Sequence, residues 1–170
     1  MFIGLLLLVS VLTPVGYIND FAHILKPETV SLLNQKLETF SRNTGNEISV
    51  VTITKLGDET IETYAEKLFQ EWAIGKEKED NGLLLLVSVE DRETRIEVGY
   101  GLEPVVTDIA SGRIINEVLT PAFQAGDYDG GLNKAVDTIM ALIGGEAIPP
   151  IQGPSINWSQ FFPYALFIFI

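Results

Sequence analysis

An almost continuous apolar run from Leu83 to Val89 (LLLLVSV) is the feature that most restricts the fold of this chain. A strand with one face in water alternates apolar and polar residues, whereas an unbroken apolar run is typical of a strand that is covered on both faces. After the turn at 90–93, residues 94–100 do alternate apolar and polar side chains. We therefore expect a hairpin whose first strand lies inside a sheet, with a layer of structure on each side.

Four segments carry apolar residues at spacings of three and four, which indicates amphipathic helices. They lie at about 27–43, 58–72, 107–121 and 128–143. Pro27 suits the first turn of the first helix, and Asp58 or Thr60 can cap the second. The β-branched residues of 48–53 predict a further strand, which should pair in parallel with 83–89. The order α-β-α-β-β-α-α predicts an α/β fold, a small three-layer sandwich with a mixed sheet and helices on both faces.

The hairpin register brings two distant segments together. If the turn is centred near Asp91, antiparallel pairing places Gly82 opposite Tyr100 and Asp80 opposite Leu102. The segment 80–82 then lies beside 99–103 at one end of the sheet, and Asp108 opens the next helix a few residues later.

This register predicts that the carboxylates of Asp80, Glu103 and Asp108 converge, with Glu97 further back on the polar face of its strand. Carboxylates gathered in a small space repel one another unless a cation joins them, and hard oxygen ligands in a flexible loop suit Ca²⁺ or Mg²⁺. Ordinary structural roles remain open: Asp108 as a helix N-terminal carboxylate, Asp80 as a turn former, and Glu97 as a partner of Arg95. The sequence predicts a divalent-cation site, with these roles as the alternative.

The charge of the chain narrows its possible partners. Eleven basic and 23 acidic residues give a net charge of -12, and all of them lie between residues 20 and 146. This balance argues against nucleic acid, whose phosphates require Lys and Arg, and favours cations or basic partners. The alternative to a cationic partner is that the acidic residues only keep the domain soluble. The absence of cysteine excludes disulfides and thiolate zinc sites, and the single histidine, His23, excludes mechanisms that need a histidine pair.

Both ends of the chain are apolar. Residues 2–12 have the length of the hydrophobic region of an export signal, with a buried N-terminal strand as the alternative. We expect residues 1–14 to be this signal, 15–146 a monomeric soluble domain, 147–160 a proline-containing linker, and 161–170 the start of a transmembrane helix. The alternative for 161–170 is a tail that docks on the domain. The sequence therefore predicts an exported protein anchored to the outer side of the bacterial cytoplasmic membrane.

Several short motifs, taken in order, resemble the TPM domain family, which spans bacterial membrane proteins, plant thylakoid-lumen proteins and an animal receptor-accessory branch. The resemblance covers roughly residues 15–146. The matching motifs are GYIND at 16–20, WAIG at 72–75, DNG at 80–82, RIEVGYGLE at 95–103, TD at 107–108, PAF at 121–123 and GDY at 126–128.

The resemblance implies a Rossmann-like sandwich with a signal peptide ahead and a membrane helix behind. It also implies divalent-cation binding in an acidic groove, which maps onto Asp80, Glu97, Glu103 and Asp108, and it adds Asp20 as a matching family aspartate. Two functions follow: a non-catalytic, cation-stabilised module that assists assembly of a membrane complex, or a metal-dependent acid phosphatase, as the plant branch is described. The sequence offers no nucleophile and base pair, and its negative charge repels phosphate, which favours binding.

Overall fold

A computed structural model describes residues 12–76 and 78–146 of the chain. Most of the expected export signal, the whole linker at 147–160 and the apolar segment 161–170 lie outside the described residues. None of the helices within the described ranges combines the length and the apolar composition that a membrane span requires.

Four strands form one sheet in the order β1-β2-β3-β4. They are β1 (Ile18–Asp20), β2 (Glu47–Ile53), β3 (Gly82–Ser88) and β4 (Glu93–Val98). The first three strands are parallel and β4 is antiparallel to β3, so the mixed sheet expected from the sequence is confirmed. The sequence did not indicate β1, because three residues are too few to show a period of two. The strand exists through its pairing with β2, in which Ile18 lies opposite Val50.

The β3–β4 register differs by one residue from the expected one. Leu83 lies opposite Val98, so Gly82 faces Gly99 rather than Tyr100, and the Gly99 N–H donates to the Gly82 carbonyl at 2.9 Å. The turn decides this register: Arg92 adopts a left-handed conformation with φ of 57°, and its N–H donates to the Val89 carbonyl at 3.3 Å. The hairpin is therefore centred between residues 90 and 91.

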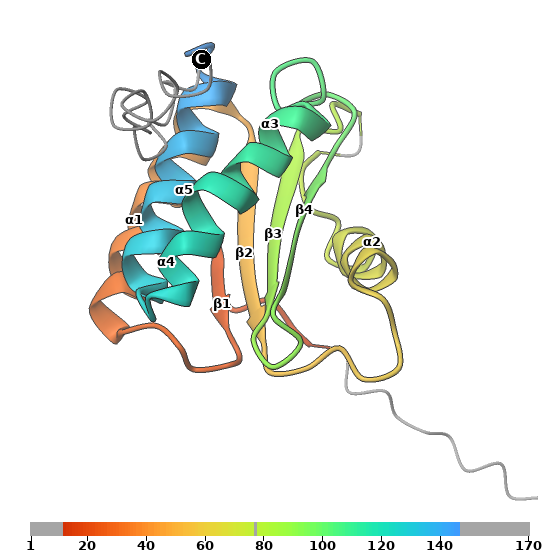
Figure 1. The fold of residues 1–170 in the computed structure, drawn as a ribbon. Helices are drawn as coiled ribbons and strands as arrows, with labels where there is room; N and C mark the ends of the chain where they lie inside the picture. Colours follow the sequence, from red (N-terminus) through yellow and green to blue (C-terminus); the bar gives the residue numbers. More distant parts are fainter. Residues whose placement is uncertain (1–11, 77, 147–170) are drawn as a thin grey trace, which may run out of the picture.

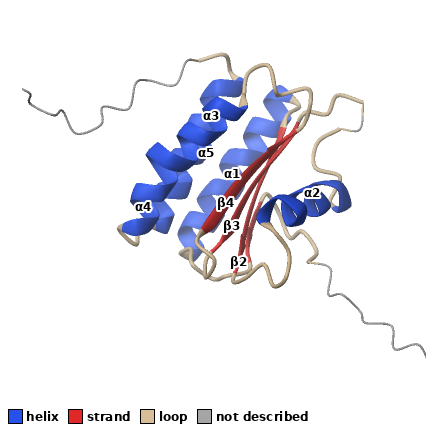
Figure 2. Ribbon diagram, turned by 45° about the vertical axis from the view of Figure 1, so that its right-hand side comes forward, coloured by secondary structure: helices blue, strands red, loops and turns tan. Residues whose placement is uncertain are grey.

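Helices cover both faces of the sheet (Figure 1), and an edge-on view shows the three layers (Figure 2). One face carries α1 (Pro27–Thr44), α3 (Asp108–Arg113), η1 (Ile114–Leu119), α4 (Thr120–Gln124) and α5 (Tyr128–Ile143); the other carries α2 (Ile61–Glu71). Along β3, Leu83, Leu85 and Val87 pack toward the first group of helices. Leu84 and Leu86 pack toward α2. This division explains the continuous apolar run, since both faces of β3 are buried.

The helix expected to end near Pro121 continues to Gln124, through a π-helical turn. Pro121 has no N–H to donate to a carbonyl one turn earlier, and inside a regular α-helix its ring would collide with that turn. Here the N–H of Thr120 reaches back five residues to the Ile115 carbonyl. The wider turn accommodates the proline, and the chain remains helical beyond it.

Candidate functional site

The segment 79–82 and the residues that follow β4 approach each other backbone to backbone. The Asp80 carbonyl accepts from the Gly101 N–H at 3.0 Å, one pair beyond the Gly82–Gly99 hydrogen bond. A Cβ atom on Gly99 would collide with the Asp80 carbonyl oxygen, and one on Gly101 with the Glu79 carbonyl oxygen. Only glycine allows this contact. The meeting of the two segments predicted from the sequence is confirmed, despite the shift in register.

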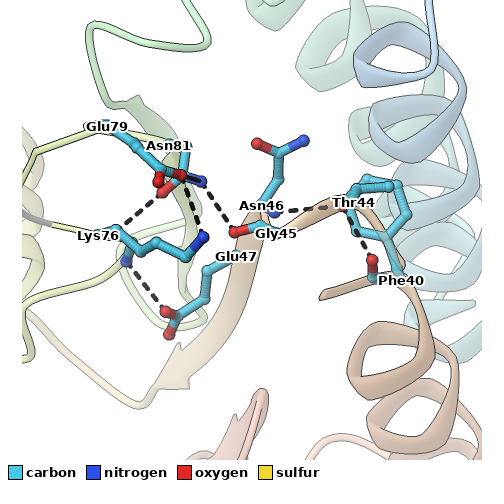
Figure 3. Close-up of polar contacts among 9 residues, drawn as sticks. Phe40, Thr44, Gly45, Asn46, Glu47, Lys76, Glu79 and Asn81 are labelled. Carbon is cyan, nitrogen blue, oxygen red and sulfur yellow. Dashed lines mark hydrogen bonds and ion pairs between the residues drawn. The ribbon is translucent and has the colours of Figure 1, made fainter. Parts of the chain in front are cut away.

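Asn81 fixes this end of the sheet (Figure 3). Its side chain is only 6% exposed, and its Oδ1 accepts from the Lys76 N–H at 2.9 Å. Its Nδ2 donates to the Gly45 carbonyl at 2.8 Å and to Glu79 Oε2 at 3.0 Å. The buried amide thus joins the turn before β2 to the loop before β3, with all of its hydrogen-bonding groups engaged.

Glu47, the first residue of β2, is hydrogen-bonded to the same loop (Figure 3). Its N–H donates to the Asn81 carbonyl at 3.0 Å, and its Oε2 accepts from the Gly75 N–H at 3.0 Å. Asp80 itself has φ of 44°, a left-handed conformation that aspartate tolerates better than most residues. Sequence reasoning missed the roles of Asn81 and Glu47. A charged residue beginning a β-branched strand was the available signal for Glu47.

Asp80, Glu103 and Asp108 lie around this loop with exposed side chains. Within the described part of the chain, no hydrogen bond or ion pair engages any of the three carboxylates. The cap of α3 is the Thr107 hydroxyl, which accepts from the Ala110 N–H at 3.2 Å, so Asp108 contributes only its charge to the helix N-terminus.

The three side chains are not assembled into a formed metal site. Across residues 12–76 and 78–146, no group of three or more His, Asp or Glu side chains is arranged to hold a metal ion. The backbone brings the segments together, but the convergence expected from the register does not extend to the carboxylate groups. Like charges on an exposed surface repel one another and stay hydrated.

Glu97 has the structural role that the sequence left open. Its Oε2 accepts from Arg95 Nη2 at 3.0 Å and from Nε at 3.1 Å. Glu97 lies opposite Leu84, which packs toward α2, so its side chain is on the α2 face of the sheet. Glu97 is therefore held in an ion pair with Arg95 on the α2 face, unlike the three exposed carboxylates, which have no partner within the described residues.

Asp20 is separated from the other predicted ligands. It ends β1 opposite Thr52, which in turn lies opposite Val87, five residues along β3 from Gly82. At 3.3 Å per residue, this places Asp20 about 17 Å from the Asp80 end of the sheet. Its carboxylate accepts from the Thr52 hydroxyl and from the N–H groups of Ile24 and Leu25 at 3.2 and 3.0 Å. Asp20 thus holds the loop after β1.

Exposed apolar side chains lie close in the chain to Glu103 and Asp108: Tyr100 and Val105 are in the loop after β4, and Ile109 is in the first turn of α3. Tyr100 is 78%, Val105 39% and Ile109 79% exposed. Buried Leu102 anchors the turn between them: its N–H donates to Gly99 and its carbonyl accepts from Val106, both at 2.8 Å. We call these residues the amino-end surface, because they lie by the amino ends of β2 and β3. The surface consists of Asp80, Tyr100, Glu103, Val105, Asp108 and Ile109. Where exposed apolar groups form a contiguous patch rimmed by charge, the patch is typical of a surface that binds a partner.

Comparison with known proteins finds a matching family model and similar solved structures. A family model described as the TPM domain matches residues 18–142. The solution structure of the N-terminal domain of a P. gingivalis protein is 33% identical, with a TM-score of 0.71, over 76% of this chain and 82% of that chain.

Two more distant structures show the fold alone. The N-terminal domain of the cg2496 protein from Corynebacterium glutamicum is 16% identical, with a TM-score of 0.58, over 79% of this chain and 84% of that chain. The BA42 protein from Bizionia argentinensis is 21% identical, with a TM-score of 0.61, over 75% and 92%. No curated protein matches the chain.

Proposed function

This chain belongs to the TPM domain family, and we propose that it is an interaction module that binds a divalent cation and a partner protein through its amino-end surface. The observation that carries this proposal is the combination, on the loops before β3 and after β4 and the start of α3, of exposed apolar side chains with carboxylates that have no partner among the described residues. The hydrogen bonds of Asn81 fix the backbone of the loop before β3, and the close contacts of Gly99 and Gly101 join this loop to the one after β4. Rigid support with free side chains is the arrangement that a binding surface requires.

Cation binding is supported by the contrast among the five acidic residues that the sequence singled out. Asp20 and Glu97 are engaged by protein donors, whereas Asp80, Glu103 and Asp108 have none within residues 12–76 and 78–146. Ca²⁺ accepts irregular sets of carboxylate, carbonyl and water oxygens, so it tolerates a surface that is not assembled beforehand better than Mg²⁺ does. A bound cation would relieve the repulsion among these carboxylates.

The chemistry of the surface also supports the proposal of a protein partner. Tyr100 and Ile109 offer apolar contacts, and the acidic residues around them favour a basic segment. A net charge of -12 adds a long-range attraction to such a segment. We propose that the partner belongs to a membrane protein complex and presents basic and apolar residues together.

Location at the membrane is part of the proposal, with its support in residues 1–14 and 161–170 of the sequence. A fusion of residues 1–146 to an enzyme that is active only outside the cytoplasm should be active. Inactive fusions that accumulate in the cytoplasm would contradict export.

A calcium titration of thermal unfolding tests the cation site, using the full chain in detergent. A ligand that binds only the folded state stabilises it by RT ln(1 + [L]/Kd), or about 2.7 kcal/mol at one hundred times Kd. Millimolar Ca²⁺ should therefore raise the melting temperature by several degrees. The double change Asp80→Asn/Asp108→Asn should remove most of this shift.

Asp58→Asn is the matched control, because Asp58 is exposed, lies at the other end of the sheet and has no partner among the described residues. Asp137 is less suitable, since it forms a 2.6 Å ion pair with Lys36 and its loss changes the starting stability. A full calcium shift in the double variant would place the cation elsewhere. No shift in the natural chain would remove cation binding from the proposal.

Phosphomonoester hydrolysis, the alternative implied by the family resemblance, has no comparable observation at this surface. Arg95, the basic side chain that the sequence places near the cluster, is held by Glu97 on the α2 face. Turnover of a generic phosphomonoester that stops when a chelator is added would favour hydrolysis over binding alone.

A further inference from the structure

A cleft of about 450 Å³ lies at the end of the fold remote from the amino-end surface. The β3–β4 hairpin forms one wall with Arg92 and Thr94, and the α4–α5 corner forms the other with Thr120, Phe123 and Tyr128. The β3–β4 hairpin and helices α4 and α5, which supply these residues, are seen in Figure 1. Its volume is in the range of small-molecule sites, about 300–1,000 Å³.

Four polar side chains of this cleft have no partner among the described residues, whereas the Ser88 hydroxyl donates to Asp91. Within the described ranges, no hydrogen bond or ion pair engages the guanidinium of Arg92 or the hydroxyls of Thr94, Thr120 and Tyr128. Thr94 lies opposite Val87, which packs toward α5, so the Thr94 side chain is on the cleft side of the sheet. Glu93, the other charged residue of the lining, precedes Thr94 on the strand and alternates toward the α2 face.

Arg92 occupies a backbone position that disfavours it. Its φ of 57° lies in the left-handed region, where glycine or asparagine is less strained. The guanidinium of Arg92 forms no ion pair within the described residues that would offset this backbone strain. Backbone strain of this kind concentrates at functional sites, where the side chain is needed in one place.

The helical wall is also irregular at the cleft. The π-helical turn ends at Leu119, so Thr120 is the first residue after it. Such turns are frequent at functional sites, and this one, which accommodates Pro121, places Thr120 on the wall of the cleft. The rings of Phe123 and Tyr128 lie 5.0 Å apart at an interplanar angle of 38° and supply a half-buried aromatic surface beside Thr120.

We propose that this cleft binds a small anion that carries a flat apolar ring, such as an aromatic carboxylate. Arg92 pairs with the anionic group, the hydroxyls of Thr94 and Thr120 donate to its oxygens, and the ring packs against Phe123 and Tyr128. This assignment needs neither the cation nor the partner of the amino-end surface, because the two sites lie at opposite ends of the sheet.

Ligand-observed NMR on the full chain in detergent tests the assignment with three probes: benzoate, benzylamine and acetate. Benzoate should bind, whereas benzylamine lacks the anion and acetate lacks the ring, and each should bind at least tenfold more weakly. Arg92→Gln and Thr120→Val should each weaken benzoate binding, the first by about tenfold or more, as expected for a charged hydrogen bond. Arg42→Gln, on the exposed last turn of α1, should leave it unchanged.

Arg92→Gly separates binding from folding. Glycine relieves the left-handed strain, so this variant should melt at a higher temperature than the natural chain while losing benzoate binding. The proposal is overturned if benzoate fails to bind at millimolar concentration, if benzylamine binds as tightly, or if Arg92→Gln leaves benzoate affinity unchanged.

Discussion

Replacing Asn81 by alanine should destabilise the domain strongly, although the residue lies in a loop. The side chain is 6% exposed and makes three hydrogen bonds: it accepts from Lys76 and donates to Gly45 and Glu79. Each bond contributes about 1 kcal/mol net, and a backbone group left without a partner costs more if water cannot reach it. The expected loss is about 3 kcal/mol of unfolding free energy, a large share of the total for a domain of this size.

The isosteric change Asn81→Asp separates shape from hydrogen-bond polarity. The new carboxylate keeps the acceptor for the Lys76 N–H but faces the Gly45 carbonyl and Glu79 Oε2 without a proton to donate. The Glu79 side chain is 55% exposed and can rotate toward solvent, so its charge should add little repulsion. We expect a loss of about 3 kcal/mol near pH 7. The pKa of the introduced carboxyl should be raised in the folded state, so acidification through that pKa should recover part of the loss.

Chemical denaturation of the natural chain and both variants in detergent measures these losses, and thermal melting should show decreases of about 10 °C. Asn116 supplies the matched control, since it is exposed on η1 and no side-chain hydrogen bond engages it within the described residues. Asn116→Ala and Asn116→Asp should change stability by less than about 0.5 kcal/mol. If Asn81→Ala is equally mild, the loop before β3 is not held by its amide, and the rigidity assigned to the amino-end surface is wrong.

Three further outcomes follow from the same structure. Gly101→Ala should destabilise the fold by several degrees in melting temperature because its Cβ meets the Glu79 carbonyl, whereas Gly112→Ala, with open space around its Cβ in α3, should stabilise it by about 0.5–1 kcal/mol; equal effects would refute the contact. Hydrogen bonds from the Ser88 hydroxyl and the Leu56 N–H lower the pKa of Asp91 below its ordinary 3.8. Its stabilising contribution is therefore complete above that value and lost as pH falls through the lower folded-state pKa, and acid unfolding curves should flatten in Asp91→Asn. Residues 15–146 should fold alone as a monomer, as judged by circular dichroism and sedimentation; an unfolded or dimeric product would contradict this.

Local patterns in the sequence were sufficient for most of the architecture. Helical stripes at 27–43 and 128–143 and the apolar run of β3 predicted layers on both faces of a mixed sheet, and the structure confirms them. These features depend on spacing along the chain, which is set by the periods of helix and strand. β1 and the β3–β4 register escaped prediction because they depend on a partner strand and on the conformation of Arg92.

The candidate site shows the same division. The expected hairpin register identified Asp80 and Glu97 as acidic residues of interest, and the family resemblance added Asp20, but nothing in the sequence distinguishes one carboxylate from another by its surroundings. Folding brings the N–H groups of the loop after β1 to Asp20 and aligns Arg95 with Glu97, while it leaves Asp80 without a donor among the described residues. A side chain acquires its role from groups that arrive from elsewhere in the fold. The sequence by itself therefore predicted a set of candidate cation ligands, and only the tertiary structure decided which of these carboxylates have protein donors among the described residues.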